Sequence, residues 1–275
     1  MARAGRGLLL WIGWLVLVSP LIAAEVEVLF TANEGVLIRA GDEAVLIDSH
    51  LAEPYSLYGA LPAPLLAKLE AAAPPFDTVD LVLASHVHRD HFQGPPAKAF
   101  LAARPQALLA SSPQVLEALG EPPPGEGRLR SVLPQPGESE TLRRGGIEVE
   151  FLRLSHGSGR HARIQNLGHI IRIGGVKILH IGDAFDDPAN FAPYGLAERD
   201  LDLVLVPYWF YWSASGQECL RRHLHAKAVA AVHIPPQELD GVRAELAKRF
   251  PEVQVPGRAL EPIRLTAASA AEPQN

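Results

Sequence analysis

The feature that most constrains this chain is a group of four metal-binding side chains within six residues, His86-Val87-His88-Arg89-Asp90-His91. The group directly follows the apolar segment 81–84, which is typical of a buried strand. Because side chains alternate along a strand, His86 and His88 can bind one ion while Asp90 and His91 turn towards a second. The motif therefore predicts a site for two metal ions at the end of a strand.

The donor types limit which metal the site selects. Imidazole and carboxylate without thiolate suit zinc best, and iron and manganese are the other metals compatible with this set. Cys219 is the only cysteine, which excludes an intramolecular disulfide and argues against a cysteine-ligated metal.

Length and charge set the class of protein. A chain of 275 residues with 48% apolar side chains is large enough for one large domain or two small ones with a full core. The net charge is −6, and no basic run exceeds short arginine pairs, which argues against nucleic acid as a partner. We expect a small-molecule substrate instead.

The first 24 residues have the order of a secretory signal. Arg3 and Arg6 precede the apolar stretch 8–18, and a Ser-Pro pair then precedes the small residues just before Glu25. We expect cleavage there, giving a periplasmic or secreted protein whose residues 25–275 form a single domain. The alternative is an uncleaved N-terminal anchor, the one case in which we expect membrane contact. A lipoprotein is excluded because no cysteine lies directly after the apolar stretch, where a lipid would be attached.

The remaining chain alternates between strand-like and helix-like segments. The Pro- and Gly-rich segment 121–139 is predicted to be a surface connection between two halves. Two sheets with helices on their outer faces would place the strand ends of both halves along one shared edge. The predicted strands are 26–30, 35–39, 44–48, 79–85, 107–110, 147–154, 169–173, 176–181, 201–206 and 228–234, and the predicted helices are 65–73, 97–103, 217–223 and 237–249.

Three more potential ligands, His156, Asp183 and His233, follow predicted strands of the second half. Together with Asp48 and the 86–91 motif, their order along the chain resembles that of the metallo-β-lactamase-fold superfamily, and the match spans nearly all of the chain after the leader. The resemblance implies an α/β fold of four layers, an αβ/βα sandwich, with the site at the sheet edge.

The resemblance also implies a role for each residue. His86, His88 and His156 would hold a first metal, Asp90, His91 and His233 would hold a second, and Asp183 would bridge them. Asp48 would accept hydrogen bonds that fix the loop of the motif. Two zinc ions per chain would deprotonate a shared water for hydrolysis, and Asp90 would also accept the proton of that water.

The bridging aspartate is similar to the pattern of glyoxalase II, lactonases and RNase Z. The commonest zinc β-lactamases carry cysteine in place of Asp183, so that activity is disfavoured. No sequence corresponding to the exosite arm of RNase Z is found. Flavin-linked oxygen reductases of the superfamily carry glutamate where this chain has His88, and their flavodoxin domain would need a longer chain.

Substrate contacts are predicted from the aromatic run 208–212, which follows the predicted strand 201–206. Tyr208, Trp209 and Trp212 would form an apolar wall with polar tips, the alternatives being a small core or a membrane-surface contact. His161 is expected to touch substrate or orient the leaving group, unless it is an ordinary loop histidine. Arg160 and Arg163 are candidates to receive an anionic group.

The sequence thus predicts an exported dinuclear zinc hydrolase of a small ester, lactone, thioester or phosphoester. One alternative is a mononuclear iron dioxygenase of the persulfide type, which shares the ligand set but leaves Asp90 and two imidazoles unused. The other is a non-catalytic metal-binding or partner-binding protein of the same fold. Seven intact ligand positions speak against the latter, because buried charges are costly without a metal.

Overall fold

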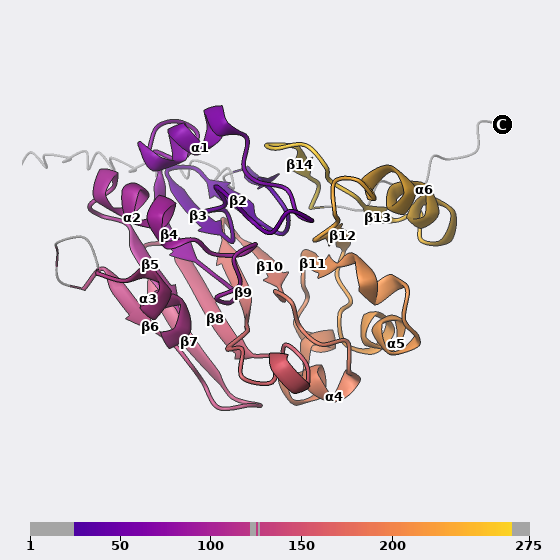
Figure 1. The fold of residues 1–275 in the computed structure, drawn as a ribbon. Coiled ribbons are helices and arrows are strands. Elements are labelled where there is room, and N and C mark those ends of the chain that lie inside the picture. Colours follow the sequence, from indigo (N-terminus) through magenta and orange to yellow (C-terminus); the bar gives the residue numbers. More distant parts are fainter. Residues whose placement is uncertain (1–24, 122–124, 126, 266–275) are drawn as a thin grey trace, which may run out of the picture.

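Two stacked β-sheets form the centre of the molecule, and helices cover both outer faces (Figure 1). The structure, a computed structural model, describes residues 25–121, 125 and 127–265. This arrangement confirms the predicted four-layer αβ/βα sandwich. The predicted leader, residues 1–24, lies outside the described residues.

The first sheet begins as an antiparallel meander of β1, β2 and β3 and continues in parallel through β4, β5 and β6. Its outer face is covered by three helices, α1 (Ala63–Glu70), α2 (Gly94–Ala103) and α3 (Pro113–Leu119). In spatial order its strands are β14 (Pro262–Ile263), β1 (Val26–Phe30), β2 (Val36–Ala40), β3 (Glu43–Ile47), β4 (Val79–Leu83), β5 (Leu108–Ser111) and β6 (Leu129–Ser131).

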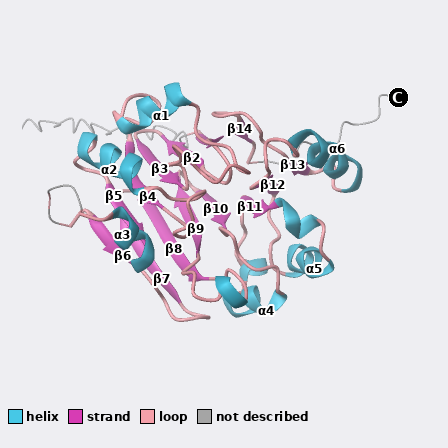
Figure 2. Cartoon of the chain, in the orientation of Figure 1, coloured by secondary structure: helices cyan, strands magenta, loops and turns pink. Residues whose placement is uncertain are grey.

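The second sheet is antiparallel from β7 to β10 and parallel from β10 to β13. Its strands are β13 (Val253–Gln254), β12 (Ala228–Val232), β11 (Leu203–Pro207), β10 (Val176–His180), β9 (Leu167–Ile173), β8 (Ile147–Arg153) and β7 (Ser139–Arg144). Its helices are α4 (Pro188–Phe191), α5 (Ala214–Arg222) and α6 (Leu239–Arg249), with short 3-10 turns η1 (Gly159–His161), η2 (Ala192–Tyr194), η3 (Leu196–Glu198) and η4 (Tyr208–Tyr211). Figure 2 shows the helices lying outside the strands.

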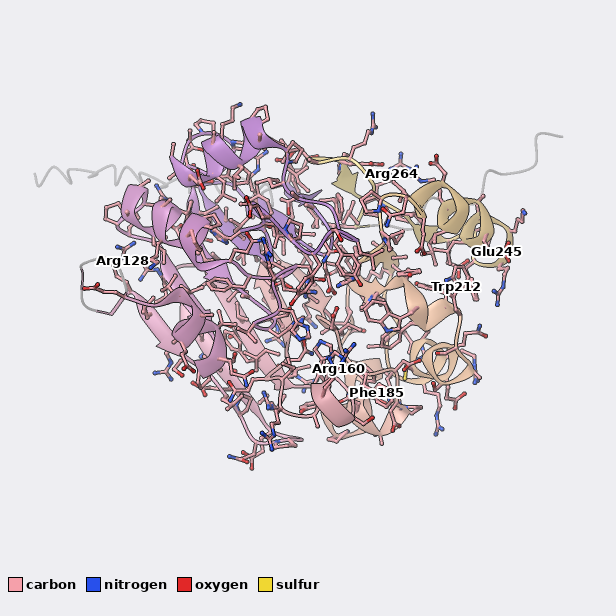
Figure 3. The ribbon with its side chains drawn as sticks, viewed as in Figure 1. Arg128, Arg160, Phe185, Trp212, Glu245 and Arg264 are labelled. Atoms are coloured by element: carbon pink, nitrogen blue, oxygen red, sulfur yellow. The ribbon has the colours of Figure 1, made fainter. Side chains whose placement is uncertain are left out.

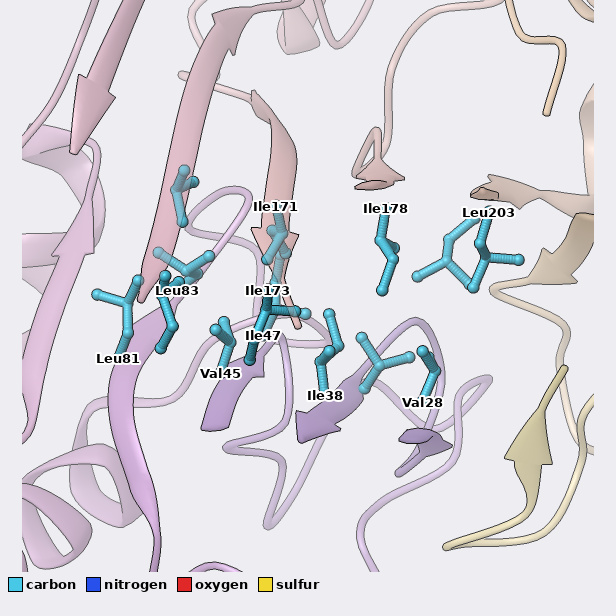
Figure 4. Packing of buried hydrophobic residues seen from close by; sticks show 14 of the residues in the cluster. Val28, Ile38, Val45, Ile47, Leu81, Leu83, Ile171, Ile173, Ile178 and Leu203 are labelled. Carbon is cyan, nitrogen blue, oxygen red and sulfur yellow. The ribbon is translucent and has the colours of Figure 1, made fainter. Parts of the chain in front are cut away.

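The main core lies between the two sheets and follows from the alternation of side chains along each strand. In β4, Leu81 and Leu83 point into this core while Val82 points to the helix layer. Ile171 and Ile178 enter the same core from the second sheet (Figure 4). Full burial of such a side chain contributes about 1.5–3 kcal/mol relative to exposure.

Some elements were not predicted. The segment 121–139 contains β6, and β7 follows it at the sheet edge, so the prediction of a plain connection was wrong at its C-terminal end. The β7 sequence is polar, and the strand pairs with β8 through a two-residue turn at Gly145, whose φ of 58° suits such a hairpin. Helix α3 is short and starts where the Ser112 side chain accepts the Val115 N–H.

Between residues 25 and 265, the helices that the structure describes are all too short or too polar to cross a membrane.

Candidate metal centre

The loops that follow β4, β8, β10 and β12 meet at one edge of the paired sheets and bring the predicted ligands together. The predicted ligands other than Asp90 belong to two groups of donor atoms, each with all atoms within 4.8 Å of one another. The first group is His86, His88, His156 and Asp183, and the second is Glu34, His91, Asp183 and His233. Asp90 lies beside the second group, with its Oδ2 3.3 Å from His233 Nε2 and 3.7 Å from His91 Nε2.

Asp183 belongs to both groups, and its two oxygens face different partners. Oδ2 lies 3.4 Å from His156 Nε2 and 3.7 Å from His86 Nε2. Oδ1 lies 3.1 Å from His233 Nε2 and 3.3 Å from His91 Nε2. One carboxylate therefore faces both sets of imidazoles, which is the geometry of a bridging ligand.

Asp48 fixes the loop that carries the histidines. Its Oδ1 accepts a hydrogen bond of 2.7 Å from the Ser85 N–H, and its Oδ2 lies 2.9 Å from His91 Nδ1. Burial alone would raise the pKa of Asp48, but the hydrogen bond and charge of His91, together with His180 and the Ser85 hydrogen bond, outweigh it and the pKa is lowered. Because Asp48 contacts Nδ1, the other ring nitrogen of His91, Nε2, is the one that faces Asp183.

The backbone at the site adopts conformations that only strong local contacts retain. Asp48 and His233 have φ of 46° and 63°, in the left-handed region that most side chains avoid. His233 is held there by its N–H bond of 2.9 Å to the Asn33 carbonyl. Gly182 also has a positive φ of 56°, and a Cβ there would lie 2.6 Å from Ser85 Cβ, so the residue before Asp183 must be glycine.

Protonation and burial make these residues fit a metal ion. Burial lowers the pKa of His86 well below its usual value and that of His88 to about 4, so both are neutral, the form that ligates metals. His86 Nε2 and Asp183 Oδ1 are buried without a hydrogen-bond partner. Converging donor atoms that no protein group satisfies are what a metal site requires.

A pocket of about 440 Å³ opens beside both groups. It is lined by Tyr55, Tyr58, His88, Asp90, His156, Arg160, His161 and Asp183. His161 stacks on His156 with ring centroids 4.9 Å apart and accepts a hydrogen bond of 2.9 Å from Arg160 Nε at its own Nε2. Burial, with His156 and Arg160 nearby, lowers the pKa of His161, which keeps the ring neutral.

Arg160 supplies the only guanidinium among the residues that line this pocket. Within the described part of the chain, no carboxylate forms an ion pair with it. Figure 3 labels Arg160 and Phe185 near one another in this view, and the Phe185 ring and the His161 Cβ approach the loop at Gly157. Among the described residues, the pocket lining thus offers one guanidinium, Arg160, that donates to His161 and has no carboxylate partner.

The structure does not form the predicted wall of Tyr208, Trp209 and Trp212, none of which lines the pocket. Trp209 reaches the site from behind, edge-on to His233 at 5.1 Å. The Tyr208 hydroxyl lies 3.4 Å from Glu238, and Trp212, 38% exposed, lies 5.4 Å from the Arg249 guanidinium. Because η4 turns successive side chains in different directions, the run does not present one face.

Tyr55, Tyr58 and Glu34 at the site were not predicted. Tyr58 lines the pocket and contacts His233, while Glu34 is fully buried in the second group. Burial raises the pKa of Glu34, and Asp183 is one of the carboxylates that raise it further. In the sequence, Glu34 is an acidic residue between two apolar strands, a pattern typical of an ordinary turn residue.

A sandwich of two sheets with paired His/Asp groups at its edge defines a class of metal-dependent hydrolases. The model of the beta-lactamase superfamily domain matches residues 45–256, and the chain belongs to this family. It is a metal-dependent hydrolase of the metallo-β-lactamase fold.

Relatives agree with this assignment. The chain is 29% identical over 174 residues to a UPF0173 metal-dependent hydrolase of Polaromonas sp., a match that covers 56% of this chain and 60% of the relative. It is 26% identical over 248 residues to a UPF0173 metal-dependent hydrolase of Thermus thermophilus, covering 86% and 96%. The crystal structure of an isothiocyanate hydrolase from Delia radicum gut bacteria shares the fold, with a TM-score of 0.58, 16% identity and coverage of 88% and 100%.

Proposed function

We propose that this protein is an exported dinuclear zinc hydrolase that acts on a small ester, lactone, thioester or phosphoester. The observation that carries the proposal is the position of Asp183, whose two oxygens face separate groups of imidazoles. His86, His88 and His156 would hold the first ion, Asp90, His91 and His233 the second, and Asp183 both. When bound, two such ions lower the pKa of a water and polarise a substrate oxygen.

The chain's own residues prepare the reaction. Asp90 is nearly buried, lines the pocket and has its Oδ2 turned inward, so it can receive the proton released by the attacking water. Asp48 holds the His91 ring in one orientation. Tyr58, whose pKa is raised by burial and by Asp183, keeps its proton and can donate it in a hydrogen bond to the substrate oxygen.

The pocket argues for a small substrate. A volume of about 440 Å³ is in the usual range for small-molecule sites, and its mouth offers Arg160 and His161 to a polar or anionic group. Two observations favour hydrolysis over the mononuclear dioxygenase and the non-catalytic alternative. The second group has its own converging donor atoms, and both groups are accessible from the pocket through Asp183.

The test is reconstitution with metal. Protein stripped by a chelator is reloaded with zinc and assayed on chromogenic esters, lactones, thioesters and phosphodiesters. We expect no turnover without metal. Full turnover should appear only near two zinc ions per chain, because both metal positions must be filled for a two-metal mechanism. A single tightly held iron, with oxygen consumption and no hydrolysis, would contradict the proposal and support the dioxygenase.

Export has its own test. A reporter fused after residue 30 should reach the periplasm or medium, and the mature N-terminus should fall at or near Glu25. The matched control lacks the apolar stretch 8–18 and should stay in the cytosol. Full-length wild-type protein in the cytosol would refute export, while full-length protein in the membrane would favour the anchor.

A further inference from the structure

Glu34 is the least satisfied acid in the described part of the chain. It lies in the turn between β1 and β2, has no exposed surface, and neither of its carboxylate oxygens has a hydrogen-bond partner. A buried charge without partners strongly destabilises a fold unless something neutralises it. Such a group therefore needs an explanation beyond packing.

The surroundings of Glu34 point towards the second metal position. Glu34 is one of the four residues whose donor atoms, with those of His91, Asp183 and His233, all lie within 4.8 Å of one another, and its Oε2 also lies 3.6 Å from His91 Nδ1, the nitrogen that Asp48 contacts. Its neighbour Asn33 donates a hydrogen bond of 2.9 Å to the Asp90 carbonyl and accepts one from the His233 N–H. The turn that carries Glu34 is thus hydrogen-bonded to the backbone of Asp90 and of His233, two residues of the second metal position.

Two other roles for Glu34 do not fit the contacts. Asp48, not Glu34, makes the short contact to His91 Nδ1 at 2.9 Å. Glu34, Asp48 and His180 also lie close together, but both ring nitrogens of His180 are used. Nε2 donates to the Glu34 carbonyl at 3.0 Å and Nδ1 accepts the Gly182 N–H at 3.2 Å, which leaves no donor atom for a separate ion there.

We propose that Glu34 is a further carboxylate of the second metal position and makes the two positions chemically unequal. The first position then offers three imidazoles and one carboxylate, whereas the second offers two imidazoles and three carboxylates, from Asp90, Asp183 and Glu34. Imidazole-rich sites suit zinc, and carboxylate-rich sites suit harder ions such as manganese. Glu34 therefore gives the second position a high affinity for Mn²⁺ relative to the first.

The experiment measures Mn²⁺ binding rather than turnover. Metal-free protein is loaded with one equivalent of zinc, and binding of added Mn²⁺ is followed by the electron paramagnetic resonance signal of the free ion. We expect the wild type to bind one Mn²⁺ and Glu34→Gln to bind it at least tenfold more weakly, with the zinc retained in both. Glu150→Gln, which changes a buried acid paired with Arg199 far from the site, should bind Mn²⁺ as the wild type does.

Two further measurements separate ligation from other roles. Glu34→Asp keeps the charge but shortens the side chain. A ligand role therefore predicts weaker Mn²⁺ binding, whereas a purely electrostatic role predicts Mn²⁺ binding equal to that of the wild type. The melting temperature of metal-free Glu34→Gln should stay close to that of the wild type, because an amide of the same size replaces a buried carboxyl group whose oxygens have no hydrogen-bond partner. A lower melting temperature with unchanged Mn²⁺ binding would overturn the proposal, as would wild-type binding by both variants.

This inference rests on the proposed dinuclear function, and the two can fail separately. A wild-type protein that binds only one ion of any kind would contradict both. Two bound ions whose relative affinities do not depend on Glu34 would contradict only the role of Glu34.

Discussion

Tyr58 lies edge-on against His233, with the ring centroids 4.4 Å apart and the planes at 83°. Burial and the nearby Asp183 and Asp90 raise the pKa of the phenol, so Tyr58 remains a hydrogen-bond donor at neutral pH. This donor lines the pocket beside His233, where the proposed hydrolysis would develop negative charge on a substrate oxygen.

Removing that hydroxyl should slow the chemical step. We expect Tyr58→Phe to lower kcat on the order of 100-fold, with little change in KM or in bound metal. Tyr55→Phe, at an exposed tyrosine of the same pocket, is the control and should keep kcat. Steady-state kinetics with elemental analysis decide the matter, and an unchanged kcat in Tyr58→Phe would show that the phenol only packs against His233.

Arg160 should set a preference for acidic substrates. We compare 4-nitrophenyl butyrate with mono-4-nitrophenyl glutarate, which differ mainly in a terminal carboxylate. Arg160→Gln should raise KM for the acidic ester about five- to tenfold and leave the neutral ester unchanged, because one solvent-exposed charge-assisted contact is lost. Arg163→Gln, outside the pocket lining, is the control. Equal effects on both esters would exclude anion recognition by Arg160.

The aromatic run should act mainly through stability. Trp209→Ala removes a half-buried ring from behind His233, and we expect it to lower the free energy of unfolding by roughly 2–4 kcal/mol. Trp212→Ala, at an exposed ring, should change it by less than about 1 kcal/mol. Neither change should raise KM in protein that retains its metal. A higher KM in Trp212→Ala would restore the predicted substrate wall.

His169 should make the fold sensitive to acid. It is fully buried without hydrogen-bond partners, and burial together with His180 lowers its pKa to about 3. The unfolded chain, with a histidine pKa of about 6.5, binds a proton between these values and the folded chain does not. Stability from neutral His169 is therefore present above pH 6.5 and falls by about 1.4 kcal/mol per unit as the pH drops below it.

The check is the pH profile of the unfolding free energy for His169→Leu. Without its metal, the variant should lose less stability than the wild type between pH 6.5 and pH 5, because one buried neutral histidine is absent. Denaturant titrations at several pH values give both slopes. Parallel profiles would mean that His169 is protonated in the folded protein as readily as in the unfolded chain.

The sequence predicts the sheets and the ligand loops because both depend on local patterns. Apolar runs such as 79–83 form strands, and ligands that follow strands running in the same direction meet at one edge, even where an antiparallel strand lies between them. Edge strand β7 was missed because an exposed strand does not need an apolar sequence. Glu34 and Tyr58 join the site only through long-range packing, which no local pattern reveals.

The prediction that residues 208–212 line the pocket differs from the structure for another reason. The composition of this run predicts contact with something apolar but not the direction of each ring. The direction depends on η4, which sends Tyr211 into a buried cluster and leaves Trp212 beside Arg249. Side-chain direction at the end of a strand is set by the turn that follows, and that turn has no strong sequence signal here.

The bridging position of Asp183 is the central claim, and metal content tests it most directly. Zinc-reconstituted wild type and Asp183→Ala are desalted and measured by elemental analysis, with Asp186→Ala as the control three residues along the same loop. The wild type and the control should retain about two zinc ions per chain. Asp183→Ala should lose metal from both positions and retain well under one. Retention of one full zinc ion by Asp183→Ala would contradict the account, because it would assign Asp183 to a single position.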